Sequence, residues 1–370
     1  MSWQWVTSDV ALREAIEQAR GYEAVAVDTE FRRRDTFFPQ VALVQVATPD
    51  HCWLIDPLTL SDTGPLKALL VDPSVVKVLH SASEDLEVFE YWLGVLPSPL
   101  FDTQRAAALL NRGFGLSYRA LVQQLLGTEL AKDETQSDWL ARPLSAAQCE
   151  YAALDVTLLI ACWPTLAGEC HARGRFAWVL EEGSHMSTGG RGPLAKFKNA
   201  WKLQPKQQAV LRALVEWREA EARSRDKPRS WILSDRTLSD VAQKCPLSLP
   251  QLAAIDGLHQ GLLRRQGKAL LSLIADATAS SAPIEALAKP ASAAVKRLAK
   301  TLAGELTTIA EDLGANPEIL LPSRELELLA QQAMGQPAPE PSHWQGWRKD
   351  TVIAPLQRRA LQQLKQGAAT

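Results

Sequence analysis

Cysteine is scarce in this chain of 370 residues, and long apolar runs are missing from it. The five cysteines (Cys52, Cys149, Cys162, Cys170 and Cys245) are odd in number and contain no C-x-x-C pair, which argues against a disulfide framework and a thiolate zinc site. No uninterrupted apolar run reaches the roughly 18 residues that span a bilayer. The N-terminal segment has early acids and no basic start before an apolar stretch, so we expect no signal peptide. A cytoplasmic protein without a membrane partner is expected.

The residues that are present describe a folded chain with an uneven charge distribution. Apolar residues make up 46% and charged residues 22% of the chain, which is ordinary for two or three globular domains. The net charge of −2 divides into −11 for residues 1–190, +11 for residues 191–300 and −2 for residues 301–370. A basic middle beside an acidic front suggests a polyanion-binding module joined to a carboxylate-rich domain. A solvated basic helix bundle is the alternative.

The front of the chain mixes strands with helices. Short β-branched runs predict the strands Glu23–Asp28, Val41–Thr48, Cys52–Asp56 and Val75–His80. Helical periodicity follows at Glu84–Leu93, Thr103–Asn111, Ser117–Leu126 and Ala146–Cys170. This alternation favours an α/β or α+β layer fold.

The back of the chain is predicted to be helical and divided by two linkers. The predicted helices are Lys206–Ser224, Thr237–Gln243, Leu249–Asp256, Leu262–Asp276, Ala291–Leu313 and Ser323–Met334. Gly183–Pro193 is rich in glycine and serine, and Ala277–Pro290 in alanine, serine and proline. We therefore expect a domain over 1–182, a linker over 183–200, a helical domain over 201–280 and a second helical domain over 281–370.

Three acidic motifs are candidates for chemistry. Asp28 and Glu30 share one face of the first strand, and two adjacent carboxylates repel each other unless a cation lies between them. Asp85 follows a strand, and Ser81 and Glu84 have the capping-box spacing just before it. Tyr151 and Asp155 lie one helical turn apart on one face. Each motif alone is also what a solvated strand end, helix start or helix face would look like.

Together, the order D-x-E, Asp and Y-x-x-x-D resembles the tyrosine-bearing branch of the DEDD exonuclease superfamily. The blocks DTEFRRRDTFFPQVALVQ, KVLHSASEDLEVF, FDTQ and SDWLARPLSAAQCEYAALD are similar to ribonuclease D over residues 24–160. Residues 204–276, with LVEWREAEARSRDKPRSWILSD and LPQLAAIDGL, resemble HRDC domains, and residues 291–370 resemble a second, diverged copy. The resemblance implies a ribonuclease H-like α/β (α+β) exonuclease domain with a mixed sheet, followed by one or two all-α HRDC bundles.

The resemblance also implies a mechanism. Asp28, Glu30 and Asp155 would bind one of two divalent cations, Mg²⁺ or Mn²⁺, with Asp28 bridging to the second and Asp85 supporting it. Tyr151 would orient the attacking water, because a phenol with a pKa near 10 is a poor base at neutral pH. The enzyme would release nucleoside 5′-monophosphates from RNA 3′ ends, and transfer RNA precursors are the substrate that the family suggests. A monomer is expected.

A competing histidine-bearing pattern is rejected. His51 precedes Asp56 by the five residues of that branch, but both lie in a β-rich run about 20 residues after D-x-E, whereas the third motif belongs on a later helix.

Further residues are candidates for substrate contact. Phe31, Arg32 and His80 neighbour the acidic motifs, and Trp139 and Arg142 lie in a family-like block without an assignable role. Phosphate contacts are expected from the basic helical region. The candidates there are Lys206, Arg223, Arg225, Lys227, Arg229, Arg264, Arg265 and Lys268. Trp201, Trp217 and Trp231 are expected in the core.

Two other functions stay open on the sequence. A proofreading-type DNA exonuclease would carry the same acidic residues. A non-catalytic nucleic-acid adaptor or helicase accessory would not need the complete set, and no phosphate-binding loop is present: Gly261 to Gly267 and Lys268 is one residue too long.

Overall fold

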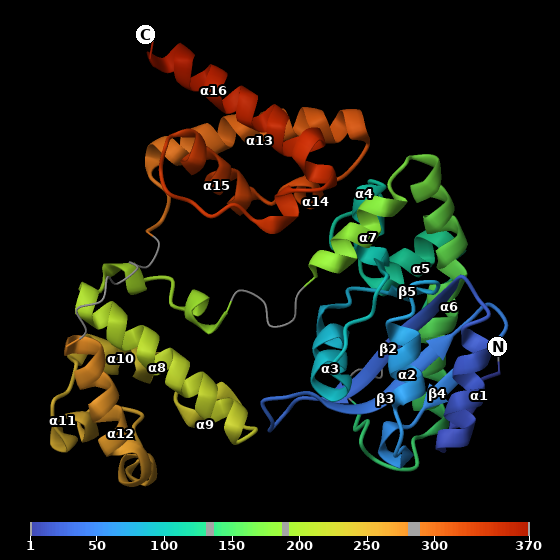
Figure 1. The fold of residues 1–370 in the computed structure, drawn as a ribbon, viewed down its shortest axis with the longest axis horizontal. Coiled ribbons are helices and arrows are strands. Elements are labelled where there is room, and N and C mark those ends of the chain that lie inside the picture. Colours follow the sequence, from blue (N-terminus) through green and yellow to red (C-terminus); the bar gives the residue numbers. More distant parts are fainter. Residues whose placement is uncertain (1, 131–136, 187–191, 280–288, 369–370) are drawn as a thin grey trace. The chain divides into compact units, whose positions relative to one another are not determined.

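The computed structural model describes residues 2–130, 137–186, 192–279 and 289–368. The chain divides into two compact units. The first comprises Met1–Arg32, Val41–Thr188 and Ala291–Thr370, and the second comprises Arg33–Gln40 and Gly189–Pro290. The two units are described separately (Figure 1).

A six-stranded sheet forms the centre of the first unit, in the order β1-β4-β3-β2-β5-β6. The strands are β1 (Gln4–Val6), β2 (Ala24–Arg32), β3 (Gln40–Ala47), β4 (Cys52–Ile55), β5 (Val76–Leu79) and β6 (Leu100–Asp102). β1 and β4 are parallel, as are β2 with β5 and β5 with β6, whereas β3 and β4 are antiparallel. The predicted mixed sheet is confirmed. The sequence reading missed β1 and β6, which are only three residues long.

Helices cover the sheet and form the remainder of the first unit. Around the sheet lie α1 (Asp9–Ala19), α2 (Gly64–Leu70), α3 (Ser83–Leu93), α4 (Thr103–Leu109), α5 (Tyr118–Leu126), α6 (Ala146–Ala172) and α7 (Phe176–His185). A C-terminal bundle contains α13 (Ala293–Leu313), α14 (Pro317–Leu320), α15 (Ser323–Ala333) and α16 (Ala354–Ala368). Of these, α1, α2, α7, α14 and α16 were not anticipated from the sequence.

Two apolar clusters lie on opposite faces of β2, because strand side chains alternate. Val25 and Val27 belong to the cluster that includes residues of α1, α2 and α3. Ala24 and Ala26 belong to the other cluster, which includes residues of α6 and of the C-terminal bundle. Asp28 and Glu30 therefore follow a stretch of β2 that is buried on both faces.

Helix α6 is long and apolar enough to cross a membrane by length and composition alone. Half of its most apolar stretch is buried inside the protein, and α6 contacts β2, β4 and β5. A buried helix between a sheet and other helices has the same length and composition, so α6 is a core helix of this fold.

The C-terminal bundle shares its core with the sheet and the helices that cover it. The Trp178 and Trp347 rings stack at 4.4 Å. Glu182, 5% exposed, forms an ion pair with Arg348 and accepts a hydrogen bond from the Trp347 indole at 3.3 Å. The first compact unit thus contains both ends of the chain, which the linear order of predicted domains does not suggest. The predicted domain boundaries themselves stay a prediction.

The first residues of the predicted linker at Gly183 are helical instead. Gly183 to His185 form the end of α7, and Gly183 lies so close to Leu100 that an added Cβ would overlap its carbonyl oxygen. Glycine is required here for close packing and not for flexibility. Residues 187–191 of that linker and 280–288 of the second lie outside the described residues, and residues 277–279 of the second belong to α12.

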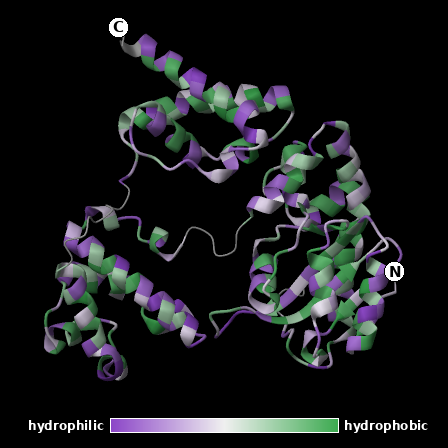
Figure 2. Cartoon of the chain, in the orientation of Figure 1, coloured by the Kyte–Doolittle hydropathy of each residue, from purple (hydrophilic) through white to green (hydrophobic). Residues whose placement is uncertain are grey.

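The second unit is a helical bundle with one short loop from the front of the chain. Its helices are α8 (Pro205–Ser224), α9 (Arg229–Ile232), α10 (Asp235–Lys244), α11 (Leu249–Ala253) and α12 (Gln260–Ala279), after the 3₁₀ turns η2 (Pro193–Lys196) and η3 (Ala200–Lys202). In Figure 2 these helices carry both hydrophilic and hydrophobic residues along their length, as amphipathic helices around a small core do. The loop Arg33–Gln40, which joins β2 to β3, packs with this bundle.

Candidate active site

Strand β2 presents two carboxylates on one face. Asp28 and Glu30 are half-buried, whereas Thr29 between them is 6% exposed and points to the opposite side. The alternation predicted from D-x-E is confirmed. The buried valines Val25 and Val27, which precede the pair on β2, fix which face of the strand each carboxylate occupies.

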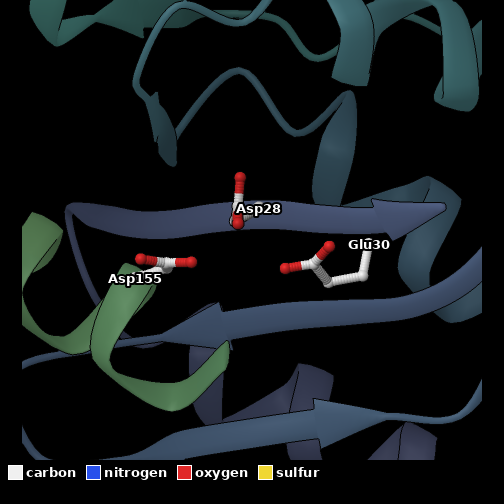
Figure 3. Close-up of side chains that lie close together, drawn as sticks. All are labelled: Asp28, Glu30 and Asp155. Atoms are coloured by element: carbon white, nitrogen blue, oxygen red, sulfur yellow. The ribbon is translucent and has the colours of Figure 1, made fainter. Parts of the chain in front are cut away.

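Helix α6 brings a third carboxylate to the same face. The helix begins with a capping box in which Ser145 and Gln148 each accept the other's backbone N–H, and α6 packs against β2. One carboxylate oxygen from each of Asp28, Glu30 and Asp155 lies within 4.8 Å of the others. In Figure 3 the carboxyl groups of Asp155 and Glu30 point toward one another, with Asp28 between them. Residues 125 positions apart in sequence thus form one cluster.

The electrostatics of this cluster show a shortage of positive charge. Loss of hydration, and then the carboxylates of Asp85, Asp155 and Glu30, raise the pKa of Asp28 well above its ordinary value. Burial and then Asp155 and Asp85 raise the pKa of Glu30 to about 9. Three oxygen donors at this spacing, each destabilised as an anion by its neighbours, suit a hard divalent cation. The residues present therefore fit such an ion.

Asp85 lies beside this cluster but is not among its three converging ligands. It occupies the first turn of α3, is 8% exposed, and accepts a hydrogen bond of 2.5 Å from the Thr29 hydroxyl. Burial raises the pKa of Asp85 to about 7, although the Thr29 hydrogen bond acts in the opposite direction. Thr29 therefore links Asp85 to the strand that carries Asp28 and Glu30.

The predicted capping box before Asp85 is wrong. Ser81 has a left-handed backbone with φ of 56°, and the N-cap of α3 is Ala82, without a side-chain cap. The Ala82 N–H instead donates to the Asp102 carboxylate at 2.9 Å, and the same carboxylate caps α4 by accepting from the Arg105 N–H. Asp102 therefore fixes the starts of α3 and α4 together.

Tyr151 lies one turn before Asp155 on α6, as predicted. Its ring is 6.0 Å from that of Trp139, which is 3% exposed. Arg142 binds both oxygens of Asp56, at 2.7 and 2.8 Å, and donates to the carbonyls of Ala42 and Trp139. This provides the role that the sequence did not assign to Trp139 and Arg142: they hold the segment that leads into α6 against the sheet.

Tyr118 was missed by the sequence reading. Its hydroxyl donates to the backbone carbonyls of Leu154 and Asp155, at 3.0 and 2.7 Å. Burial, and then the charge of Asp155, raise the pKa of this phenol, so it stays a donor. A tyrosine at the second position of the predicted helix Ser117–Leu126 carries no pattern that would have indicated this contact.

The three predicted substrate contacts lie near these groups. Phe31 and Arg32 are half-buried at the end of β2. The His80 ring lies 5.6 Å from the Tyr118 ring, and its Nδ1 is 2.8 Å from the Thr103 hydroxyl. Burial lowers the pKa of His80. Their contact with substrate stays a prediction.

The predicted RNA-binding cations of the second unit fall into two groups. Lys206, Arg225, Arg264, Arg265 and Lys268 are exposed, and Arg223 is exposed but pairs with Glu219 at 3.2 Å. Arg229 instead forms a bidentate pair with Glu219, at 2.5 and 2.8 Å, and Lys227 donates to the Asp35 carbonyl at 3.3 Å. The second group already has partners within the unit.

The predicted burial of Trp231 is wrong, whereas Trp201 and Trp217 are half-buried. Trp231 is 63% exposed, and the Lys227 ammonium group lies 5.7 Å from its ring. Helix α9 is only four residues long, so helical periodicity was no guide to which of its faces is buried.

Comparisons with known proteins agree with this site. The family models for a 3′-5′ exonuclease and for an HRDC domain match residues 3–170 and 207–274. Ribonuclease D of Pseudomonas paraeruginosa is 42% identical over 94% of this chain and 95% of its own length, and that of Escherichia coli is 37% identical over 89% and 90%. The crystal structure of Escherichia coli RNase D, described as an exoribonuclease involved in structured RNA processing, matches with a TM-score of 0.86 at 35% identity, covering 98% of this chain and 99% of that one. This chain belongs to the ribonuclease D family and is a metal-dependent 3′→5′ exoribonuclease.

Proposed function

We propose that the chain removes nucleoside 5′-monophosphates from RNA 3′ ends with two divalent cations, Mg²⁺ or Mn²⁺, at the β2–α6 face. The convergence of Asp28, Glu30 and Asp155 within 4.8 Å is the observation that carries this proposal. Asp28, Glu30 and Asp155 would hold one cation, and Asp28 would be shared with the second. When bound, the cations supply a water of lowered pKa and charge stabilisation for the attacking and leaving oxygens.

The chain's own residues would position the reacting groups. Tyr151 projects from the same helix face as Asp155 and would orient the attacking water by a hydrogen bond. Asp85, fixed by the Thr29 hydroxyl, would act on the second cation, directly or through water. Tyr118 keeps the α6 backbone at Asp155 in place by donating to two carbonyls. Because none of these residues reads a base, the site suits stepwise removal of any 3′-terminal nucleotide.

The natural substrate is the finer part of the proposal. We infer transfer RNA precursors, processed in a reducing cytoplasm by a monomer. The described cysteines are all free, which supports a reducing compartment. Phe31, Arg32 and His80 are proposed to contact the 3′-terminal nucleotide, and the cations Arg225, Arg264, Arg265 and Lys268 to contact RNA phosphates.

A time course on 5′-labelled RNA, with Mg²⁺ or with EDTA, tests this proposal. Loss of one nucleotide at a time from the 3′ end, only with the metal, is expected. A DNA strand of the same sequence is the matched control, and faster cleavage of DNA would favour the proofreading-type exonuclease. Equal activity in EDTA would contradict the metal mechanism, and binding without any cleavage would favour the adaptor.

A further inference from the structure

The β2–β3 loop (Arg33–Gln40) is held within the second unit by its backbone. The N–H groups of Phe37 and Phe38 both donate to one oxygen of Asp226, at 2.9 and 3.0 Å. Asp226 has a left-handed backbone with φ of 46°, which places its carboxylate at the end of α8. Two backbone donors on one carboxylate oxygen fix this loop against the bundle.

Arginine side chains hold the same loop through its aromatic ring. Phe37 is 4% exposed, and the guanidinium groups of Arg223 and Arg229 lie 4.8 and 4.6 Å from its ring centre. Glu219 pairs with both arginines. The loop therefore has a defined structure beside a concentration of cationic groups.

A cavity of about 350 Å³ opens between this loop and the bundle, and we call it the basic pocket. Its lining residues are Arg33, Arg34, Thr36, Phe37, Lys196, Arg218, Pro228, Arg229, Ser230, Ser234 and Asp235. Five of these side chains are cationic and one, Asp235, is anionic. Even when Glu219, the partner of Arg229, is counted, the pocket keeps an excess of positive charge.

Arg218 is the strongest indication of a ligand. It is 2% exposed, and its Nη1 binds the Leu233 carbonyl at 2.8 Å and the Asp235 carboxylate at 2.7 Å. Its Nε and Nη2 are buried without a hydrogen-bond partner among the residues that the structure describes. Buried donors without acceptors are costly, and charged ones more so. Because Arg218 also lines the basic pocket, an oxyanion in the pocket would offer acceptor oxygens to this guanidinium group.

We propose that the basic pocket binds a phosphate of the RNA backbone, upstream of the 3′-terminal nucleotide. A phosphodiester offers acceptor oxygens to Arg218, Arg34 and Lys196, and guanidinium groups match its geometry. The pocket also lies at the start of the ten-residue helix α10, where backbone dipoles favour an anion. This inference rests on the proposed action on RNA.

The loop that lines the basic pocket follows directly in the chain after β2, the strand that carries Asp28 and Glu30. Arg33 follows Glu30 by three residues, so the strand that carries two of the metal-binding carboxylates continues directly into the phosphate-binding loop. Because a phosphate contact is independent of base identity, such a site would suit an exonuclease that moves along any RNA sequence.

The test compares pocket variants of the full chain with matched surface variants. In an Asp28→Asn background that does not cleave, the Arg34→Gln/Lys196→Gln double variant is expected to bind a single-stranded RNA of about 16 nucleotides roughly tenfold more weakly. The slope of log affinity against log salt should fall by about 0.7 for each phosphate that the variant no longer neutralises. Arg236→Gln/Lys198→Gln removes the same charge from residues that do not line the pocket, and should change affinity less than about twofold.

Two further arms make the outcome decisive. With the active enzyme, the double variant should raise KM for the long RNA and leave kcat, and the turnover of a dinucleotide, unchanged. Arg218→Lys should weaken long-RNA binding in the same direction, and its melting temperature reports whether it folds; if it does not, the double variant decides. Equal effects in the pocket and control variants overturn the proposal.

The source of the phosphate is tested with inorganic phosphate. If phosphate raises the melting temperature of the wild type but not of the double variant while RNA affinity is equal in both, the pocket holds a free phosphate, and the RNA assignment is wrong. Failure of the proposed function is separate, because it would appear as absent Mg²⁺-dependent cleavage by the wild type whatever the binding data show.

Discussion

The acidic site of the first unit and the basic pocket of the second both bring side chains of like charge close together, but with opposite sign. In each site these side chains are partly buried, so their charges repel each other and lose hydration when the chain folds. The carboxylates can relieve their repulsion by taking up protons, and the pKa of Glu30, raised to about 9, shows that tendency. Arginine cannot lose its proton at any accessible pH. The acidic site should therefore respond to pH and divalent cations, and the basic pocket to salt and phosphates.

The largest effect that separates the two regions is expected from Asp155→Asn. The amide keeps the size of the side chain but removes the charge that completes the three-oxygen cluster, so kcat should fall at least about a thousandfold, or ~4 kcal/mol of barrier. Affinity for RNA measured without metal should not fall, because the basic pocket is untouched. Single-turnover cleavage and anisotropy titrations measure the two quantities.

Asp62→Asn is the matched control for Asp155→Asn, since the Asp62 side chain is 54% exposed and lies 3.6 Å from the Arg13 guanidinium group. Its turnover should equal that of the wild type, because an exposed ion pair contributes little to stability. If Asp155→Asn retained more than about a tenth of wild-type kcat, Asp155 would not be a ligand of the catalytic cation.

The sequence predicted the acidic site far better than the basic pocket. D-x-E on a strand and Y-x-x-x-D on a helix have fixed periodicities, so which side chains share a face follows from local geometry. The contributions of Tyr118 and of Thr29 depend on contacts across 37 and 56 positions, for which no local pattern exists. Likewise, Arg218 and Arg34 lie 184 positions apart, and both line the basic pocket because Asp226, Arg223 and Arg229 hold the β2–β3 loop.

The same distinction holds for the fold: elements set by local sequence patterns were predicted, and those that depend on contacts between distant segments were not. Long periodic segments such as α6, α8 and α13 were predicted within a few residues. Short β1 and β6 carry too few residues for a pattern, and they form because neighbouring strands pair with them. No local pattern indicated that α13 to α16 would share a core with the exonuclease-like domain, since the Glu182 to Arg348 pair and the Trp178 to Trp347 stack link distant segments.

A smaller change inside the acidic site is expected from Tyr151→Phe. Removing the hydroxyl leaves the ring packing with Trp139 and the carboxylate cluster intact, so metal binding and KM should be unchanged. If the hydroxyl only orients water, kcat should fall about 100-fold, toward the lower end of proton-transfer contributions. The pH dependence of kcat should keep its shape, and loss of a basic limb in that profile would show instead that Tyr151 titrates during turnover.

The smallest expected effect is thermodynamic and concerns Glu30→Gln. The folded pKa of Glu30, about 9, lies above the ordinary value of 4.5, so the metal-free folded state binds more protons than the unfolded state. Its stability should therefore decrease as pH rises between these two values, because ionising Glu30 beside Asp155 and Asp85 costs more in the folded protein. Glu30→Gln removes this cost. In EDTA the variant should melt a few degrees above the wild type at pH ~8.5, with a smaller difference at pH ~6.

Adding Mg²⁺ should reverse that order. Cations displace the protons that the carboxylates would otherwise hold, so the wild type should gain melting temperature with Mg²⁺, and gain more at the higher pH, whereas Glu30→Gln should gain little. The Asp28→Asn variant serves as a second neutralised ligand and should behave like Glu30→Gln. The contrary result would be a difference in melting temperature between the wild type and Glu30→Gln that is the same at pH ~8.5 and pH ~6 in EDTA. It would mean that ionising Glu30 costs no more in the folded than in the unfolded protein. In that case other groups of the protein would already neutralise the carboxylate repulsion. The acidic site would then not differ from the basic pocket in its response to pH.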